Sequence, residues 1–157
     1  MSKIAVVYWS GTGNTEAMAN AIVEGAKGAG AEVELFQVDD FKADDIANYD
    51  GVIFGCPAMG DEVLEEDSFE PFFAEAEAKL EGVPVALFGS YGWGGGAWME
   101  AWVERTKGTG AKLFKEEGLI AENAPDDDVL AECKALGADF VKSFEELRKN
   151  NIETCYC

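Results

Sequence analysis

The segment from Ile4 to Thr15 constrains the fold more than any other part of the chain. An apolar run, Ile4-Ala5-Val6-Val7-Tyr8-Trp9, leads directly into a turn of glycine and hydroxyl residues, Ser10-Gly11-Thr12-Gly13-Asn14-Thr15. Apolar residues between Met18 and Ala26 then recur at the spacing of one helical face, which predicts a helix from about Asn14. The segment therefore predicts a buried strand that passes through a tight turn into a helix.

This turn has the donors that an anion needs. A helix N-terminus leaves backbone N–H groups without partners, and its dipole favours negative charge. The two glycines let the backbone come close to a ligand, and the hydroxyl and amide side chains add neutral donors. No Lys or Arg lies between Lys3 and Lys27. A phosphate monoester fits such a turn, and an ordinary capped strand-to-helix turn is the alternative interpretation.

Two common nucleotide motifs are excluded. A nucleoside-triphosphate loop ends in Gly-Lys-Ser/Thr, whereas Gly13 is followed here by Asn14 and Thr15. The dinucleotide fingerprint G-x-G-x-x-G is incomplete, because no third glycine follows Gly13 at the required spacing. A single phosphate is therefore favoured over a pyrophosphate.

Strand and helix patterns alternate along the rest of the chain, which predicts an α/β fold. Continuous apolar runs in the first, third and fourth predicted strands suit a parallel sheet covered on both faces. We expect a doubly wound, five-stranded parallel sheet in the order 2-1-3-4-5, with helices on both faces and right-handed crossovers. One domain should span residues 1–150, followed by a C-terminal tail over 151–157. The expected strands are about 3–9, 32–38, 51–56, 84–89 and 112–120, and the expected helices about 14–27, 43–48, 68–80, 97–107 and from 126 onward.

Ligands of such sheets bind beyond the carboxyl ends of the strands, where the strand order switches. The loops after the first, third and fourth strands meet there. The latter two each carry a large polarizable side chain beside glycine, Met59 and Trp93, which could flank a flat aromatic ligand. For Trp93 alone, an exposed turn aromatic is the simpler interpretation. Trp98 and Trp102, four residues apart on a predicted helix, are expected to pack in the core.

Composition narrows the function further. The chain has 12 basic and 31 acidic residues, a net charge of −19, so nucleic acid and anionic membranes are poor partners, whereas basic proteins are good ones. The absence of histidine removes Ser-His-Asp and Cys-His catalysis and His-ligated metal sites. Cys56 and Cys133 should be buried and inert. With no membrane-spanning segment and no export signal, the expected location is the cytoplasm.

Three segments together carry a family resemblance. Residues 8–16 (YWSGTGNTE), 55–62 (GCPAMGDE) and 87–94 (LFGSYGWG) resemble the short-chain flavodoxins of anaerobic bacteria, and the similarity covers residues 3 to about 147. The resemblance implies non-covalently bound FMN, a flavodoxin-like fold, and a monomeric one-electron carrier of low potential that shuttles between semiquinone and hydroquinone. It implies an electron-transfer protein rather than an enzyme, with redox proteins as partners.

The resemblance also implies where the cofactor lies. The turn after the first strand would hold the ribityl phosphate with help from Ser90, while Met59 and Trp93 flank the isoalloxazine. The Gly60-Asp61 peptide would contact flavin N5, and Glu62 would accept a hydrogen bond from N3–H. The complete expected set of cofactor-binding residues is Ser10, Gly11, Thr12, Gly13, Asn14, Thr15, Ala58, Met59, Gly60, Asp61, Glu62, Ser90, Tyr91, Gly92, Trp93 and Gly94.

Charge and glycine content suggest how such a site would tune the cofactor. Acidic residues at 61, 62 and 65–67 are expected around the ring, where they would disfavour the second, charge-adding electron. The Gly60 carbonyl could accept a hydrogen bond from the protonated N5 if its peptide turns over, which glycine makes cheap.

Two other functions remain open at this point. An FMN-dependent NAD(P)H:quinone-type reductase would need a nicotinamide site, and no second nucleotide motif is visible. A receiver-type signalling module would need acidic residues where Ser10 and Cys56 stand.

Overall fold

The protein forms one five-stranded parallel sheet covered by helices on both faces. The computed structural model describes residues 2–11, 13–59, 63–92 and 95–155, with the backbone alone from 144 onward. The strand order is β2-β1-β3-β4-β5, and every neighbouring pair is parallel, which confirms the predicted topology. The strands are β1 (Lys3–Tyr8), β2 (Glu32–Gln37), β3 (Gly51–Gly55), β4 (Pro84–Tyr91) and β5 (Lys112–Glu122).

The helices follow the predicted order with small differences in length. The α-helices are α1 (Asn14–Gly28), α2 (Phe69–Ala76), α3 (Ala97–Gly108) and α4 (Asp127–Cys155), and the short 3-10 helices are η1 (Val38–Asp40), η2 (Ala43–Asn48) and η3 (Glu77–Lys79). The helix predicted over 68–80 thus divides into α2 and η3. Strand β4 is two residues longer than predicted, because Ser90 and Tyr91 pair with the end of β5.

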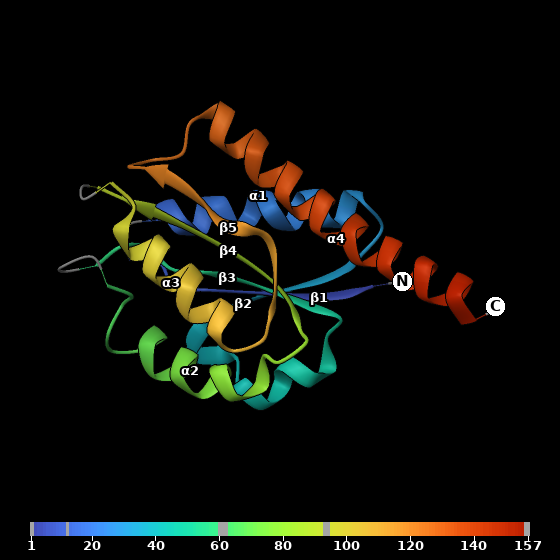
Figure 1. Ribbon diagram of the computed structural model, residues 1–157. Coiled ribbons are helices and arrows are strands. Elements are labelled where there is room, and N and C mark those ends of the chain that lie inside the picture. The colour runs from blue at the N-terminus through green and yellow to red at the C-terminus, as the bar shows by residue number, and fades with distance from the viewer. Residues whose placement is uncertain (1, 12, 60–62, 93–94, 156–157) are drawn as a thin grey trace.

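Alternate strand residues fill two cores, one on each face of the sheet. In β1, Ile4 and Val6 join a cluster with residues of α1 and α4, whereas Ala5 and Val7 join a cluster with residues of α2 and α3. Figure 1 shows this arrangement, with α1 and α4 over one face of the sheet and α2 and α3 over the other. The two covered faces explain why the central strands are apolar throughout.

Strand β5 contains a bulge that the sequence pattern did not predict. Val85 pairs with Leu113, and Leu87 pairs with Gly118, so residues 114–117 lie opposite Ala86 alone. Lys115 and Glu116 take positive φ values of 58° and 56°, which turn the chain out of the strand and back. The predicted strand from Lys112 is confirmed, with this interruption.

Helix α4 begins as predicted, because the Asp126 carboxylate caps it by accepting a hydrogen bond of 2.9 Å from the backbone N–H of Val129. The helix continues to Cys155 and so passes the expected domain boundary at residue 150. The division into a domain and a tail stays a prediction. Among the described residues, no helix is both long and apolar enough to cross a membrane.

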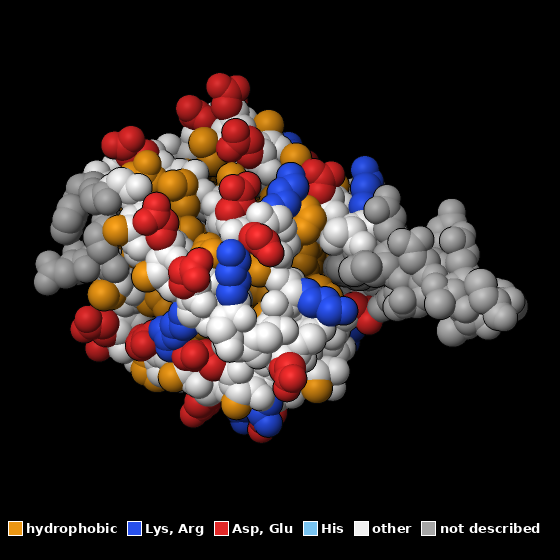
Figure 2. Space-filling view, in the orientation of Figure 1, with side chains coloured by type: hydrophobic (Ala, Val, Ile, Leu, Met, Phe, Trp, Pro, Cys, Tyr) orange, Lys and Arg blue, Asp and Glu red, His pale blue; other side chains and the backbone are white. Residues whose placement is uncertain are grey.

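Acidic side chains dominate the surface in view. Figure 2 shows Asp and Glu side chains spread over most of the visible face, with fewer Lys and Arg side chains among them. The predicted burial of Cys56 and Cys133 is confirmed, since both are fully buried free thiols.

Candidate cofactor site

A cavity opens at the carboxyl ends of the central strands. Its volume is about 260 Å³, and its walls come from the segments after β1, β3 and β4 together with the end of β5. Larger hollows beside β5 contain none of the residues expected to bind a cofactor. The cavity is lined by Trp9, Gly11, Asn14, Pro57, Ala58, Met59, Ser90, Tyr91, Gly92 and Asn123.

The turn between β1 and α1 is held by the Ser10 hydroxyl. Its Oγ accepts hydrogen bonds from the backbone N–H groups of Gly13, at 3.1 Å, and Glu16, at 3.3 Å. Gly13 has a φ of 95°, a left-handed conformation that favours glycine at the start of α1. Ser10 therefore acts within the turn as an acceptor, and it satisfies two donors of the helix N-terminus.

Two buried hydroxyl groups connect this turn to β4. The Thr15 Oγ1 and Ser90 Oγ atoms are 2.9 Å apart and hydrogen-bonded. Thr15 is 1% exposed and Ser90 is 4% exposed, although 75 residues separate them in the chain. The structure thus brings together the two segments that the sequence assigned to one phosphate.

Gly11 lies where a side chain would not fit. A Cβ atom at this position would stand 2.9 Å from Cη2 of the Trp9 indole. The close approach explains the glycine, and it places the half-buried Trp9 ring in the cavity wall, at the turn. The sequence had predicted Trp9 only as the last residue of the strand over 3–9.

After β3, the described residues on both sides of 60–62 are held by backbone hydrogen bonds. Met59 and Val63 exchange backbone hydrogen bonds of 2.8 and 3.0 Å, and the Ala58 N–H donates to the Ser90 carbonyl at 3.0 Å. Met59 is 37% exposed and lines the cavity. The expected contacts of Thr12, Gly60, Asp61, Glu62, Trp93 and Gly94 fall on residues that the structure does not describe.

Trp98 and Trp102 are core residues, as predicted. Each is 1% exposed, and the Trp98 Nε1–H donates to the Cys56 carbonyl at 3.1 Å. The Trp98 ring lies 5.5 Å from the Tyr91 ring, which supports Tyr91 in the cavity wall. Burial raises the pKa of the Cys56 thiol and so keeps it protonated.

Three lining residues, Trp9, Pro57 and Asn123, were missing from the expected set. Asn123 has a φ of 57°, and its N–H donates to the Tyr91 carbonyl at 2.7 Å. Asparagine tolerates this left-handed conformation better than most residues. Its place just beyond the last strand could have identified it, since the carboxyl ends of all the parallel strands lie at the same edge of the sheet.

The electrostatics of the cavity agree in part with the expectation. None of its described lining residues is Lys or Arg, as a site built from neutral donors requires. The carboxylate of Glu65, expected near the ring, instead bonds to three backbone N–H groups at the start of α2. Within the described ranges, no group of three or more Cys, Asp or Glu side chains could hold a metal ion.

The residues present therefore suit a flat molecule with one phosphate. Ser90, whose hydroxyl is paired with that of Thr15, lines the cavity together with the Met59 thioether and the rings of Trp9 and Tyr91.

Comparisons with known proteins agree with this geometry. A family model described as flavodoxin matches residues 6–136. The chain is 50% identical to a flavodoxin of Megasphaera elsdenii, and the match covers 89% of this chain and 99% of that protein. It is 52% identical to a flavodoxin of Clostridium beijerinckii, and this match covers 78% of this chain and 88% of that protein. The solution structure of the two-electron reduced Megasphaera elsdenii protein superimposes with a TM-score of 0.81, covering 88% of this chain and 98% of that one.

Proposed function

Because the chain belongs to the flavodoxin family, and is therefore an FMN-binding electron-transfer protein rather than an enzyme, we propose which of its residues hold each part of the cofactor. The turn from Ser10 to Thr15 binds the ribityl phosphate, and Ser90 completes it. The observation that carries this assignment is the buried hydroxyl pair of Thr15 and Ser90 beside a turn that lacks cations. Backbone N–H groups at the start of α1 supply the remaining donors.

We assign the isoalloxazine to the space between the segments after β3 and β4. Met59 lies on one side of the ring and Trp93 on the other, with Ala58, Tyr91, Gly92 and Gly94 at its edges. Glu62 accepts from N3–H, and the Gly60-Asp61 peptide contacts N5. Trp9, Pro57 and Asn123 join this set because they line the same cavity.

FMN supplies the ability to take up and release electrons one at a time. The chain contributes the surroundings that set the potentials. Neutral donors leave the phosphate uncompensated, and the acidic surface opposes further negative charge on the ring. A penalty of about 3 kcal/mol on the second electron would lower its potential by roughly 130 mV.

The acidic surface also indicates the partners. We propose that the protein acts as a monomer that docks redox proteins through their basic surfaces, because opposite fields speed encounter. We place it in the cytoplasm, where buried free thiols such as Cys56 and Cys133 stay reduced.

Stepwise reduction of the FMN-loaded protein tests the function. We expect the absorption to pass from yellow through a blue one-electron stage to colourless. The matched assay mixes the same protein with NADH or NADPH and a quinone, where we expect no catalysed oxidation of the nicotinamide. A direct change from yellow to colourless, accompanied by rapid nicotinamide oxidation, would assign the two-electron reductase function instead.

A further inference from the structure

We propose that Glu65 is a positioning residue for the flavin ring, although its carboxylate binds the backbone at the start of α2 and does not line the cavity. This inference rests on the proposed function, because it concerns the loop over residues 57–64 that we assign to the ring. Glu65 would hold the C-terminal end of this loop in place. Its loss should weaken ring binding and lower the first-electron potential.

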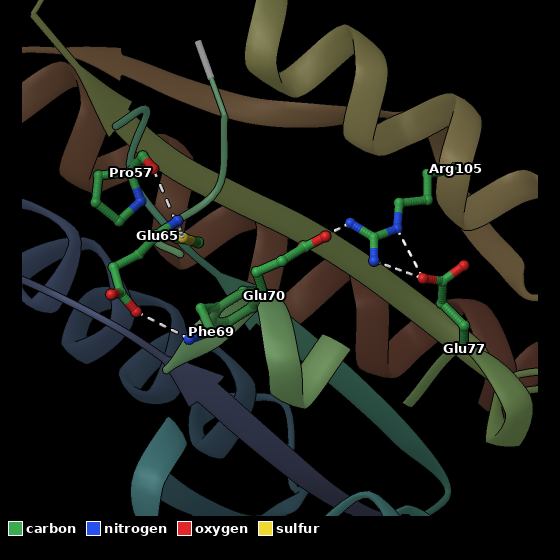
Figure 3. Close-up of polar contacts among 7 residues, drawn as sticks. Pro57, Glu65, Phe69, Glu70, Glu77 and Arg105 are labelled. Carbon is green, nitrogen blue, oxygen red and sulfur yellow. Dashed lines mark hydrogen bonds and ion pairs between the residues drawn. The ribbon is translucent and has the colours of Figure 1, made fainter. Parts of the chain in front are cut away.

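The Glu65 carboxylate is buried and fully engaged with the backbone. One oxygen accepts from the N–H groups of Ser68, at 2.7 Å, and Phe69, at 2.9 Å. The other accepts from the N–H of Asp67 at 2.8 Å, and the residue is only 6% exposed. Figure 3 shows this side chain turned toward the backbone of Phe69. These donors precede or open α2, so the charge fixes the loop end to a helix N-terminus.

The backbone of Glu65 is tied to the start of the same loop. Its N–H donates to Cys56 Sγ at 3.4 Å, and the Cys56 thiol donates to the Pro57 carbonyl at 3.6 Å. One sulfur atom therefore contacts both ends of the loop. Together with the backbone bridge between Met59 and Val63, these contacts hold the described residues on both sides of 60–62.

Arg105 of α3 holds both α2 and the following η3, through Glu70 and Glu77. Arg105 donates from Nε to Glu77 at 2.8 Å and from Nη1 to Glu70 at 2.6 Å. Figure 3 shows the Arg105 guanidinium between these two carboxylates. Glu70 also donates its backbone N–H to the Glu65 carbonyl at 2.8 Å. Glu65 thus connects the loop to the start of α2, which is ion-paired to α3 through Glu70 and Arg105.

The substitution Glu65→Gln separates positioning from space filling. Glutamine has nearly the same shape, but only one of its two terminal atoms can accept a hydrogen bond. At least one of the three backbone N–H groups is then left buried and unpaired, which is costly. The loop end should move or loosen as a result.

Loosening should affect the two potentials differently. After the first electron, the Gly60 carbonyl is proposed to hold the proton at N5, and hydrogen bonds weaken steeply with distance and angle. The packing of Met59 on the oxidised ring is less directional. The cofactor should therefore lose more affinity after the first electron than before it. Each additional tenfold loss lowers the first-electron potential by about 59 mV.

The neighbouring Glu66 provides a matched control. It is exposed and carries the same charge one residue further along the chain. Glu65→Gln and Glu66→Gln remove equal charge, so both should raise the second-electron potential, which is the charge-adding step. Only Glu65→Gln should lower the first. The loss of one negative charge is thus predicted to change the second-electron potential, and the loss of the loop contacts of Glu65 to change the first-electron potential.

The experiment compares wild type, Glu65→Gln and Glu66→Gln by fluorescence titration with FMN and with riboflavin, and by spectroelectrochemical measurement of both potentials. For Glu65→Gln we expect both dissociation constants to rise by about the same factor, roughly tenfold, because the change acts at the ring end. We expect the first-electron potential to fall by about 59 mV or more. Glu66→Gln should leave both dissociation constants and the first potential at the wild-type values.

Equal first-electron potentials in the two variants would overturn the positioning role, as would a change in thermal stability alone. Should Glu65→Gln fail to fold, Cys56→Ala carries the test, because it removes the sulfur contact while keeping the carboxylate. It should lower the first potential in the same direction, and an unchanged potential would overturn the proposal. Failure of the proposed function is distinguishable, because wild type would then bind no FMN.

Discussion

At the scale of single residues, the cofactor site depends on contacts between small polar groups. The hydroxyls of Thr15 and Ser90 are paired in a buried position where each would be costly to leave alone. Both residues belong to the set that the sequence predicted to bind the cofactor. Their hydrogen bond joins the first turn of α1 to the end of β4. The pair therefore links the turn from Ser10 to Thr15, which we propose binds the phosphate, to the segment proposed to bind the ring.

Thr15→Ala should weaken FMN binding by about 1.5–3 kcal/mol, roughly 10- to 150-fold, because it removes a hydroxyl donor to a charged acceptor. Riboflavin, which lacks the phosphate, should lose much less affinity. Fluorescence titration with both ligands measures the difference, and Thr15→Ser is the control that keeps the hydroxyl. Equal losses for FMN and riboflavin would place the phosphate elsewhere.

The buried Cys133 thiol should make the free energy of unfolding fall at alkaline pH. Burial raises the pKa of its thiol from 9.0 to about 12. Between these two pKa values the folded state therefore keeps a thiol proton that the unfolded state loses. The contribution of the protonated thiol to stability is complete below pH 9 and is lost as the pH rises toward 12. The free energy of unfolding should fall by up to about 1.4 kcal/mol per pH unit in this window. Urea unfolding at several pH values should show a smaller slope for Cys133→Ala, and an unchanged slope would exclude the thiol as its cause.

At the scale of elements, helices α1 and α4 pack through glycine. A Cβ atom at Gly25 would lie 1.9 Å from the Lys134 carbonyl oxygen, and one at Gly137 would lie 2.2 Å from the Ile22 carbonyl oxygen. The two helices can approach this closely only because neither position carries a side chain. Their packing covers the sheet face beside the phosphate turn.

Gly25→Ala and Gly137→Ala should each lower the free energy of unfolding by about 1–3 kcal/mol, because the added methyl group forces the helices apart. The helix propensity of alanine, which exceeds that of glycine, would by itself raise the free energy of unfolding. Gly28→Ala is the matched control, since no atom lies within 4 Å of its Cβ position, and it should stabilise by up to about 1 kcal/mol. Urea midpoints report all three, and a stabilised Gly137→Ala would contradict the packing argument.

At the scale of the whole molecule, the net charge of −19 should govern association. The rate constant for electron transfer to a strongly basic haem protein should fall at least tenfold as salt is raised from about 0.01 to 0.5 M, because screening removes long-range attraction. Stopped-flow measurements test this, with an acidic acceptor as the control whose rate should rise. A salt-independent rate for the basic acceptor would contradict steering by the acidic surface.

The sequence by itself determined the order of strands and helices, the 2-1-3-4-5 topology and the tight turn over residues 10–15. These features depend on local periodicity, on glycine and on general rules for parallel sheets, so they can be recognised without distant contacts. The burial of Trp98, Trp102, Cys56 and Cys133 followed from the same patterns.

Only the tertiary structure decided which of these residues contact one another directly. It paired Thr15 with Ser90 across 75 residues, brought Asn123 into the cavity wall, and bound the Glu65 carboxylate to backbone N–H groups at the start of α2. It also introduced the bulge at Lys115 and Glu116. The physical reason is that a polar side chain takes whichever buried partners the packed elements present to it. Those partners lie in segments whose relative positions no local pattern specifies.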